Sequence, residues 1–562
     1  MSQASQNNAV ERYRVNEEGI FYLEERLCSP FQLIGRGTDD SGQHYRVITY
    51  TEHISGKKQT LPIANADIGS IALWARLQGA GIDIAANRKK RERLADYLQT
   101  GGKKHFWRVC NRAGWVDKGK AYILPNGEIL QADNSNVQVI YNGGNRNYAA
   151  YQASGCLHDW QNHIAHYAQD NSRLCLALGV AFAAPLMRLL DIEGGGFHLF
   201  GDSSDGKTTT GKVALSVWGK PEELKLSWEG TGHGFANAAN ACNDGLMLLD
   251  EIGQASPRVV SHTAYSVING KGKVQGAKEG GNREINHWRV MVLSTGEKTL
   301  EGYLRANNGD WQAGQANRLP SVPANAGKGY GVYDVLHGFA DGALLSEHLN
   351  HVSGQYYGTA GRAFIAALAA DNNALDKVHE HMRTFREALP VLSGQARRVA
   401  ERFALVSAAL HLTQDYGILN FSGSLPVRKC FDDWFSREGA GKYEDRRILE
   451  QANDFMQLNG NRFMEICRLE SHGAHMPNLA GYKEPALEDC DKTAYLIIPA
   501  VFRDEIAKGF DLNKVCEVLH QANWLRQSEY GRWQIQKRIN NERQRFYLLI
   551  GSFCDPESED AE

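Results

Sequence analysis

The chain has 562 residues, of which 42% are hydrophobic and 23% charged, and its formal net charge is −3. This length is too great for one hydrophobic core and predicts two to four domains. The small net charge excludes a uniformly basic surface, so any binding of nucleic acid must depend on local basic patches.

The apolar runs of the sequence are short. None approaches the roughly 20 residues that span a bilayer, and the start of the chain lacks the apolar stretch of a signal peptide. The cysteines are scattered without a C-x-x-C pair, which argues against a disulfide framework or a zinc ribbon. We therefore predict a cytoplasmic protein with no membrane contact.

The first part of the chain, residues 13–150, has the pattern of an α+β domain. Strand-like runs at 31–34 and 45–50 flank a hairpin-type turn. Helical patterns follow at 71–78 and 88–99, and further strand-like pieces precede residue 140. We predict an N-terminal α+β domain at 13–150, followed by helices rich in Ala and Leu.

A glycine-rich turn then follows the apolar run 197–200. Its sequence, GDSSDGKT, matches G-x-x-x-x-G-K-[ST] between a strand and a helix, the context that this phosphate-binding motif requires. Lys207 would neutralise the β- and γ-phosphates of ATP, and the Thr208 hydroxyl would hold Mg²⁺. The backbone N–H groups of the turn and the helix N-terminus would bind phosphate oxygens. The predicted ATP-binding residues of this turn are Gly201, Asp202, Ser203, Ser204, Asp205, Gly206, Lys207, Thr208 and Thr209.

A second apolar strand, 245–249, ends in Asp250 and Glu251. Beside a phosphate loop, Asp250 can hold Mg²⁺ through water, and Glu251 can orient and polarise the attacking water. The alternative is a buried strand that happens to end in acids at a turn. The preceding motif favours the catalytic interpretation.

A third apolar strand, 289–293, ends in Ser294 and Thr295. In AAA+ ATPases a polar residue at this strand end contacts the γ-phosphate and the attacking water, and either hydroxyl could do so here. The alternative, a strand that simply ends in polar residues, stays open for each of them.

Glycine alternates with lysine at 269–278, as in a β-hairpin with a cationic tip. In ring ATPases a hairpin at this position projects into the central pore, where Lys271 and Lys273 would meet the phosphates of nucleic acid. A solvated basic loop is the other interpretation.

Two arginines are candidates for contacts with the γ-phosphate. Arg318, beyond the third strand, could be an arginine finger that reaches the site of a neighbouring subunit. Arg398 opens an amphipathic helix and could be a second phosphate-sensing arginine. Ordinary surface arginines would give the same pattern.

The composition changes again after residue 440. Helical patterns at 448–457, 499–507 and 512–521, a short strand at 494–498, and a two-stranded wing at 533–537 and 546–549 with neighbouring arginines predict a winged-helix domain at 441–550, which could bind DNA or protein. Residues 551–562 are acidic and predict a disordered tail.

Taken together, these motifs resemble a family of P-loop ATPases of phages and integrative elements, long catalogued as a domain of unknown function. Its members include minichromosome-maintenance-like helicases of mobile cassette elements. The resemblance covers about residues 20–550. The segments that carry it are Gly194–Gly201, Ser203–Thr209, Leu248–Gly253, Asn269–Lys273, Gly314-Gln315 with Arg318, and Arg398–Phe403.

The resemblance implies an α/β fold with a AAA+ core at 151–345 and a helical lid at 346–440. It also implies a homo-hexameric ring that binds ATP and Mg²⁺ between subunits and passes a DNA single strand through its pore. The expected function is an ATP-dependent DNA helicase or translocase in the replication of a phage or mobile element. The alternative is a remodelling or defence-related ATPase of the same class that does not unwind DNA.

Overall fold

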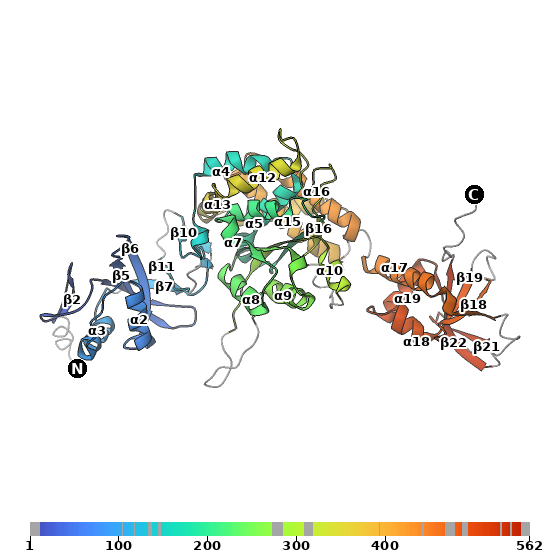
Figure 1. The fold of residues 1–562 in the computed structure, drawn as a ribbon, viewed down its shortest axis with the longest axis horizontal. Coiled ribbons are helices and arrows are strands. Elements are labelled where there is room, and N and C mark those ends of the chain that lie inside the picture. Colours follow the sequence, from blue (N-terminus) through green and yellow to red (C-terminus); the bar gives the residue numbers. More distant parts are fainter. Residues whose placement is uncertain are drawn as a thin grey trace. The chain divides into compact units, whose positions relative to one another are not determined.

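The computed structural model of the chain divides into two compact units, Met1–Trp434 and Phe435–Glu562, each with its own hydrophobic clusters (Figure 1). The predicted acidic tail lies outside the described residues from residue 552 on. The structure describes residues 12–103, 105–116, 119–132, 138–143, 148–272, 285–307, 318–392, 394–439, 443–466, 478–485, 493–528, 531–539 and 542–551.

The N-terminal part of the first unit is built around a mixed five-stranded sheet with the order β11-β7-β4-β5-β6. Apolar residues three or four apart on α2 and α3, such as Leu73 with Leu77 and Leu94 with Leu98, share one cluster with strand residues. The elements are β1 (Tyr13–Asn16), β2 (Gly19–Tyr22), β3 (Glu25–Cys28), β4 (Gln32–Thr38), β5 (His44–Thr51), β6 (Lys58–Ala64), α2 (Ile71–Gly79), α3 (Arg88–Thr100), β7 (Phe106–Cys110), β8 (Gly114–Val116), β9 (Ala121–Ile123), β10 (Ile129–Gln131) and β11 (Val139–Tyr141).

The small sheet β10-β9-β8 is hydrogen-bonded to the segments that enter the central sheet. The Trp115 indole donates to the carbonyl of Pro185 at 2.8 Å, and the Tyr122 hydroxyl donates to the carbonyl of Asp244 at 3.0 Å. The Asn243 amide donates to the carbonyl of Ala113 at 2.9 Å. These contacts attach the small sheet to the edge where the central strands begin.

The central sheet is parallel and has the strand order β13-β14-β15-β12-β16. All of its strands therefore end at the same edge, which places the residues that follow β12, β14 and β15 side by side. A mixed α/β fold with a parallel sheet is thus confirmed. Its elements are β12 (Gly195–Phe200), α6 (Lys207–Ser216), α7 (Pro221–Leu224), β13 (Leu226–Ser227), α8 (Gly232–Ala241), β14 (Gly245–Asp250), α9 (Pro257–Asn269), β15 (Val290–Gly296), α10 (Leu300–Ala306) and β16 (Ser321–Pro323).

Both faces of this sheet are covered, as Figure 1 shows, with α8 and α9 on one side and α5 and α15 on the other. Met247 and Leu249 belong to the cluster that includes α8 and α9. The intervening Leu248 meets Gly211 of α6, because successive side chains of a strand point to opposite faces. Because helices cover both faces of the sheet, both sets of side chains on each strand are buried, which explains why the strand sequences are continuous apolar runs.

Close packing between β12 and β15 requires a glycine. A Cβ added to Gly196 would lie 1.7 Å from the carbonyl oxygen of Val292, which a real side chain cannot do. This constraint fixes the position of β12, the strand that leads into the phosphate loop.

The remaining helices of the first unit surround α5, the central helix. Within the described residues α5 is long and apolar enough to cross a membrane by length and composition, but 89% of it is buried inside the unit. Burial of this kind is what the core helix of a globular protein shows. The helices are α4 (Leu157–His163), α5 (Ser172–Leu189), α12 (Gly342–Ser353), α13 (Thr359–Ala370), α14 (Ala374–Glu387), α15 (Gly394–Asp415) and α16 (Ser424–Trp434).

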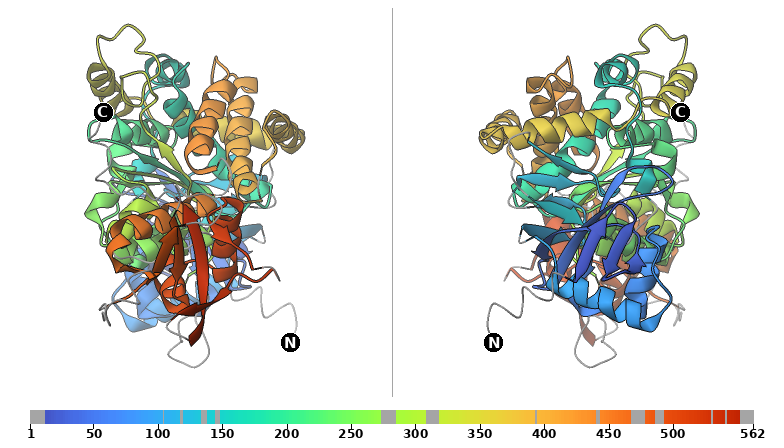
Figure 2. Two further views of the ribbon diagram at one scale, coloured as in Figure 1. Left: turned by 90° about the vertical axis from the view of Figure 1, so that its right-hand side faces the viewer. Right: turned by 90° about the vertical axis from the view of Figure 1, so that its left-hand side faces the viewer.

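The second unit packs its helices on one face of a sheet with the order β17-β18-β19-β22-β20, where β21 also pairs with β22 (Figures 1 and 2). The sequence predicts three of these strands, which correspond to β19, β21 and β22, and does not predict β17, β18 or β20. The elements are α17 (Tyr443–Leu458), β17 (Phe463–Glu465), β18 (Gly481–Pro485), β19 (Thr493–Ile497), α18 (Pro499–Val501), α19 (Leu512–Gln521), β20 (Leu525–Arg526), β21 (Ile535–Ile539) and β22 (Glu542–Gly551).

Candidate nucleotide-binding site

The predicted phosphate loop joins β12 to α6. Gly206 adopts φ of 90° immediately before the helix, a left-handed conformation that glycine takes without steric cost. Among the residues that the structure describes, the backbone N–H groups of Gly206, Lys207 and Thr208 have no hydrogen-bond partner. A helix N-terminus with unused N–H groups attracts anions, so the turn has the donors that a phosphate needs.

Lys207 lies within the curve of this loop. Its Nζ donates to the carbonyl oxygens of Gly201 at 2.9 Å and Asp202 at 2.6 Å. The residue is only 7% exposed. The ammonium group is therefore held inside the loop, at the place where a bound phosphate would need a counter-charge.

Asp250 lies beside the loop at the end of β14. Its carboxylate accepts from the Thr208 hydroxyl at 3.0 Å and from the Thr295 hydroxyl at 2.6 Å. Lys225 approaches the same carboxylate at 3.5 Å. The ends of β14 and β15 thus meet the start of α6 and the residue before β13 in one cluster.

Glu251 has an unusual backbone for its residue type, with φ of 57°. A left-handed conformation costs a non-glycine residue roughly 1–2 kcal/mol. The backbone N–H donates to the Thr295 hydroxyl at 2.9 Å, and the carboxylate accepts from the N–H of Gly253 at 3.2 Å. This turn directs the Glu251 side chain out of the line of β14 while Asp250 stays against the loop.

The two hydroxyls at the end of β15 have different hydrogen-bond partners. Thr295 bridges Asp250 and Glu251, as described above. Ser294 instead contacts the His198 ring at 2.9 Å and accepts from the Trp228 indole at 2.9 Å. Burial lowers the pKa of His198 to about 4, so this ring is neutral. Ser294 therefore belongs to the core, and only Thr295 reaches the acidic pair.

A segment after β16, residues 324–335, runs along the phosphate loop. The N–H of Ala324 donates to the carbonyl of Phe200 at 2.7 Å, and the N–H of Val332 donates to the carbonyl of Asp205 at 2.9 Å. A Cβ on Gly206 would come within 2.8 Å of Val332 Cγ2, so only glycine fits beneath this segment. We call residues 324–335 the covering segment.

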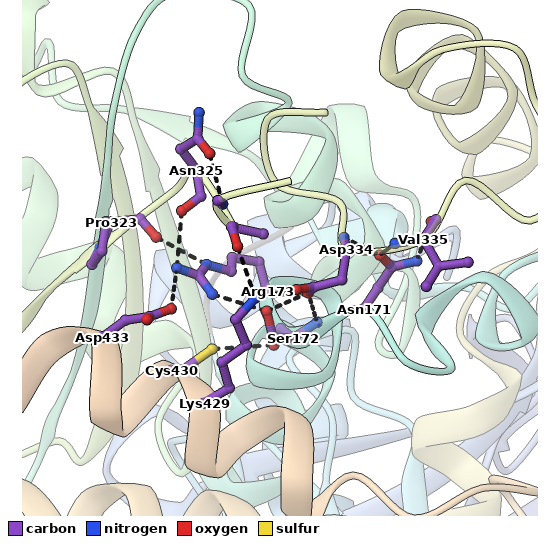
Figure 3. A network of polar contacts seen from close by, with 12 residues as sticks. Asn171, Ser172, Arg173, Pro323, Asn325, Asp334, Val335, Lys429, Cys430 and Asp433 are labelled. Atoms are coloured by element: carbon purple, nitrogen blue, oxygen red, sulfur yellow. Dashed lines mark hydrogen bonds and ion pairs between the residues drawn. The ribbon is translucent and has the colours of Figure 1, made fainter. Parts of the chain in front are cut away.

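The network in Figure 3 fixes the covering segment to α5 and α16. Arg173, fully buried on α5, donates to the carbonyls of Pro323 and Asn325 and pairs with Asp433 at 2.8 Å. Asp334 accepts from the Ser172 hydroxyl at 2.5 Å and also pairs with Lys429. The hydrogen bond from Ser172 and the ion pair with Lys429 lower the pKa of the Asp334 carboxyl against the opposing effect of burial.

The other predicted residues lie away from this cluster. Arg318 precedes β16 at the opposite edge of the sheet, where it pairs with Glu193 at 3.1 Å and donates to the Asn269 amide. Arg402, one turn after Arg398, donates to the carbonyl of Gly194 at the start of β12. The structure therefore does not bring Arg318 to the phosphate loop of its own chain, and it leaves Arg398 exposed.

The predicted hairpin is only partly described. Lys271 forms an isolated bridge with His287 at the base of the hairpin. Lys273 lies outside the described residues.

The residues of the cluster fit ATP and Mg²⁺. The loop offers unused N–H groups and a buried ammonium, which suit phosphates, and Thr208 with Asp250 offers the hard oxygen ligands that Mg²⁺ prefers. No group of three or more His, Cys, Asp or Glu residues suited to a metal occurs elsewhere in the described part of the chain.

Sequence reasoning missed two polar residues of the site. Lys225 carries no motif, and it reaches Asp250 only because β13 pairs with β14. Asn350, on α12, donates to the Thr209 hydroxyl at 3.0 Å across 141 residues of sequence. A local pattern predicts neither contact.

A family model described as "Domain of unknown function (DUF927)" matches residues 4–287. A solved structure described as "SCCmec type IV Cch - active helicase" has a TM-score of 0.70 at 18% identity, over 96% of this chain and 97% of that one. The structure of NtrX from Brucella abortus with ATP covers 50% of this chain and 60% of that one at 12% identity, but its TM-score of 0.19 supports no argument. No curated protein matches the chain.

The family model spans half of the sequence and includes the phosphate loop, Asp250 and Glu251. Over the matched 96% of its length, the chain has a fold similar to that of the solved helicase structure. The chain therefore belongs to the family described as domain of unknown function DUF927.

Proposed function

We propose that this chain is an ATP-driven DNA helicase or translocase. The observation that carries the proposal is the chain of contacts from Thr208 through Asp250 to Thr295 beside a buried Lys207. Such an arrangement suits nucleotide hydrolysis more than passive binding, because Glu251 is added to it as a candidate base.

The architecture supports a AAA+ core at 151–345. Strands β12, β14 and β15 lie in the order β14-β15-β12, with β13 and β16 at the edges. This order inserts a strand between the phosphate-loop strand and the acidic strand, which brings Thr295 next to Asp250. Helices α12–α16 are assigned to a lid at 346–440, and the unit after residue 440 to a winged helix.

The roles of the residues follow from their positions. ATP would supply the phosphoanhydride bond that is cleaved, and Mg²⁺ the charge that its oxygens need. Lys207 would neutralise phosphate charge, Asp250 and Thr208 would hold the cation, and Thr295 would keep Glu251 oriented toward the attacking water. The hydroxyl of Thr295 does this through the backbone N–H of Glu251.

Arg318 and Arg398 are assigned to the site of a neighbouring subunit. Arg318 is held by Glu193 at the other edge of the sheet from its own phosphate loop, so it can contact a γ-phosphate only across an interface, and Arg398 is exposed. This assignment supports a ring, which we propose to be a homo-hexamer with Lys271 and Lys273 facing a DNA single strand in the pore. The helicase with the similar fold is from a mobile element, which supports a role in replication of such an element.

The test is unwinding of forked DNA by the purified full-length chain with ATP and Mg²⁺. We expect ATP-dependent strand separation, and its loss in Lys207→Ala. ATP hydrolysis that unfolded protein stimulates and single-stranded DNA does not would favour the remodelling ATPase instead. A chain that stays monomeric with ATP and does not respond to DNA would refute the proposal.

A further inference from the structure

A large cavity lies at the edge of the central sheet opposite the phosphate loop. Its volume is about 1040 Å³, and its lining includes Gly194 at the start of β12, Asn243 before β14 and Arg289 before β15. These strands run parallel, so the nucleotide cluster lies at their other ends. The cavity is therefore separate from the ATP site of the same chain.

Basic side chains dominate the charge of this cavity. The lining contains Asp40 and Glu193 as its acids, against the cations Arg112, Arg188, Lys271 and Arg289, besides Arg318, which is assigned above to a neighbouring nucleotide site.

Both acids already have a partner. Asp40 pairs with Arg108 at 2.8 Å, and Glu193 pairs with Arg318. Arg289 is likewise occupied, since it pairs with Asp191. Arg188 and Lys271, by contrast, form no ion pair within the described ranges of the chain, although Arg188, together with Arg112 and Arg289, interacts electrostatically with the buried carboxylate of Asp244. The cavity therefore keeps an excess of positive charge after its internal pairs are counted.

The cations come from separate parts of the first unit and meet here. Arg112 precedes the small sheet and donates to the carbonyl of His287 at 3.2 Å, which joins it to the base of the hairpin. Arg188 is exposed near the end of α5, and Lys271 stands at the hairpin base itself. The positive surface thus continues from the hairpin onto the N-terminal part of the unit.

The character of the lining selects the kind of ligand. Trp288 is only 6% exposed, and its indole donates to the carbonyl of Val267, so it offers no free face for stacking a base. Arginine, lysine and asparagine side chains remain, which bind phosphate oxygens without reading sequence. A polyanion that runs along the hairpin would meet several of these cations in succession.

We propose that this cavity binds the phosphodiester backbone of single-stranded nucleic acid, with Arg188 as a direct phosphate contact. The proposal deepens the helicase function and rests on it for the presence of a nucleic-acid substrate. It adds a second contact surface to the hairpin lysines and predicts binding that does not depend on base sequence.

The experiment measures binding of a fluorescein-labelled oligothymidylate to the full-length chain by anisotropy over a range of salt concentrations. We compare wild type with Arg188→Gln, Arg188→Lys and Arg383→Gln. Arg383 is exposed on α14, where it pairs with Glu380, and its substitution changes the net charge by the same amount. Melting temperatures show that each variant is folded.

We expect R188Q to weaken binding and to reduce the slope of log Kd against log salt by about 0.7, the value for one phosphate contact on a single strand. R188K should keep the slope, and R383Q should behave as wild type. Equal oligonucleotide binding by R188Q and wild type would overturn the inference about the cavity. If R188Q also still unwinds forked DNA, the helicase proposal stands.

Two further outcomes separate the remaining possibilities. Displacement of the oligonucleotide by inorganic phosphate, beyond the effect of chloride at equal ionic strength, would assign the cavity to a small anion and overturn the inference. A wild-type chain that binds no oligonucleotide would refute the inference and the helicase proposal together.

Discussion

Asp244 should make the first unit less stable as the pH rises, and Asp244→Asn should remove this effect. The residue is 2% exposed and has φ of 57°. Its carboxylate accepts from the N–H of Trp115 at 3.0 Å, where the small sheet meets the central one. Burial raises the pKa of Asp244 from 3.8 to about 6, although that hydrogen bond and nearby arginines oppose the rise.

The magnitude follows from linkage. A group whose pKa is higher in the folded chain stabilises the fold below its unfolded pKa, and this contribution disappears as the pH rises through the folded pKa. The interval from 3.8 to about 6, at about 1.4 kcal/mol for each pH unit, gives roughly 3 kcal/mol. Asparagine keeps an oxygen that accepts from Trp115, tolerates a left-handed backbone and carries no charge.

The assay is the melting temperature of both chains by calorimetry between about pH 4 and pH 8, a window that brackets the two pKa values. We expect D244N to melt a few degrees higher than wild type at pH 8, and the difference to shrink toward pH 4. Asp376→Asn, an exposed site on α14, controls for loss of charge and should change stability by less than about 0.5 kcal/mol. A D244N chain that melts lower at pH 8 would show that the neighbouring arginines stabilise the carboxylate, which refutes the reasoning.

Three further substitutions test separate parts of the structure. Thr295→Val should lower kcat for ATP hydrolysis by about 5- to 150-fold, because a hydroxyl bonded to Asp250 contributes roughly 1–3 kcal/mol in a buried site. Nucleotide binding, measured by calorimetry, should persist. An unchanged kcat would exclude Thr295 from the reaction. Gly196→Ala should abolish the folded first unit, seen as loss of its melting transition, because the new methyl group would collide with Val292. Arg173→Met should lower stability by about 1–3 kcal/mol in denaturant titrations, since the carbonyls of Pro323 and Asn325 lose their buried donor. An unchanged stability would contradict this role.

The sequence predicted those parts of the site that one local stretch encodes. The phosphate turn is recognisable because its glycines, lysine and threonine are adjacent, and Asp250 because an apolar strand ends there. The choice between Ser294 and Thr295 needed the structure, since each hydroxyl takes its partners from other strands.

Contacts between distant segments could not be predicted in this way. Arg173 and Asp433 are separated by most of the first unit and meet only in the folded chain. The sequence predicts Arg318 as an arginine finger but not its partners, Glu193 and Asn269, which come from distant segments. In the second unit, the strands β17 and β18 are short and follow no strong alternation, so the sequence predicts only three strands of the six-stranded sheet.

The ion pair between Arg173 and Asp433 has a mechanical consequence. Asp433 lies next to Trp434, the last residue of the first unit, so the chain leaves that unit at a point anchored to a buried arginine. A force that pulls on the second unit would act first on α16 and on its ion pair with the Arg173 guanidinium, before it acted on any other helix. The same arginine donates to the carbonyls of Pro323 and Asn325. A force on the connection between the two units would therefore be transmitted to the covering segment beside the phosphate loop.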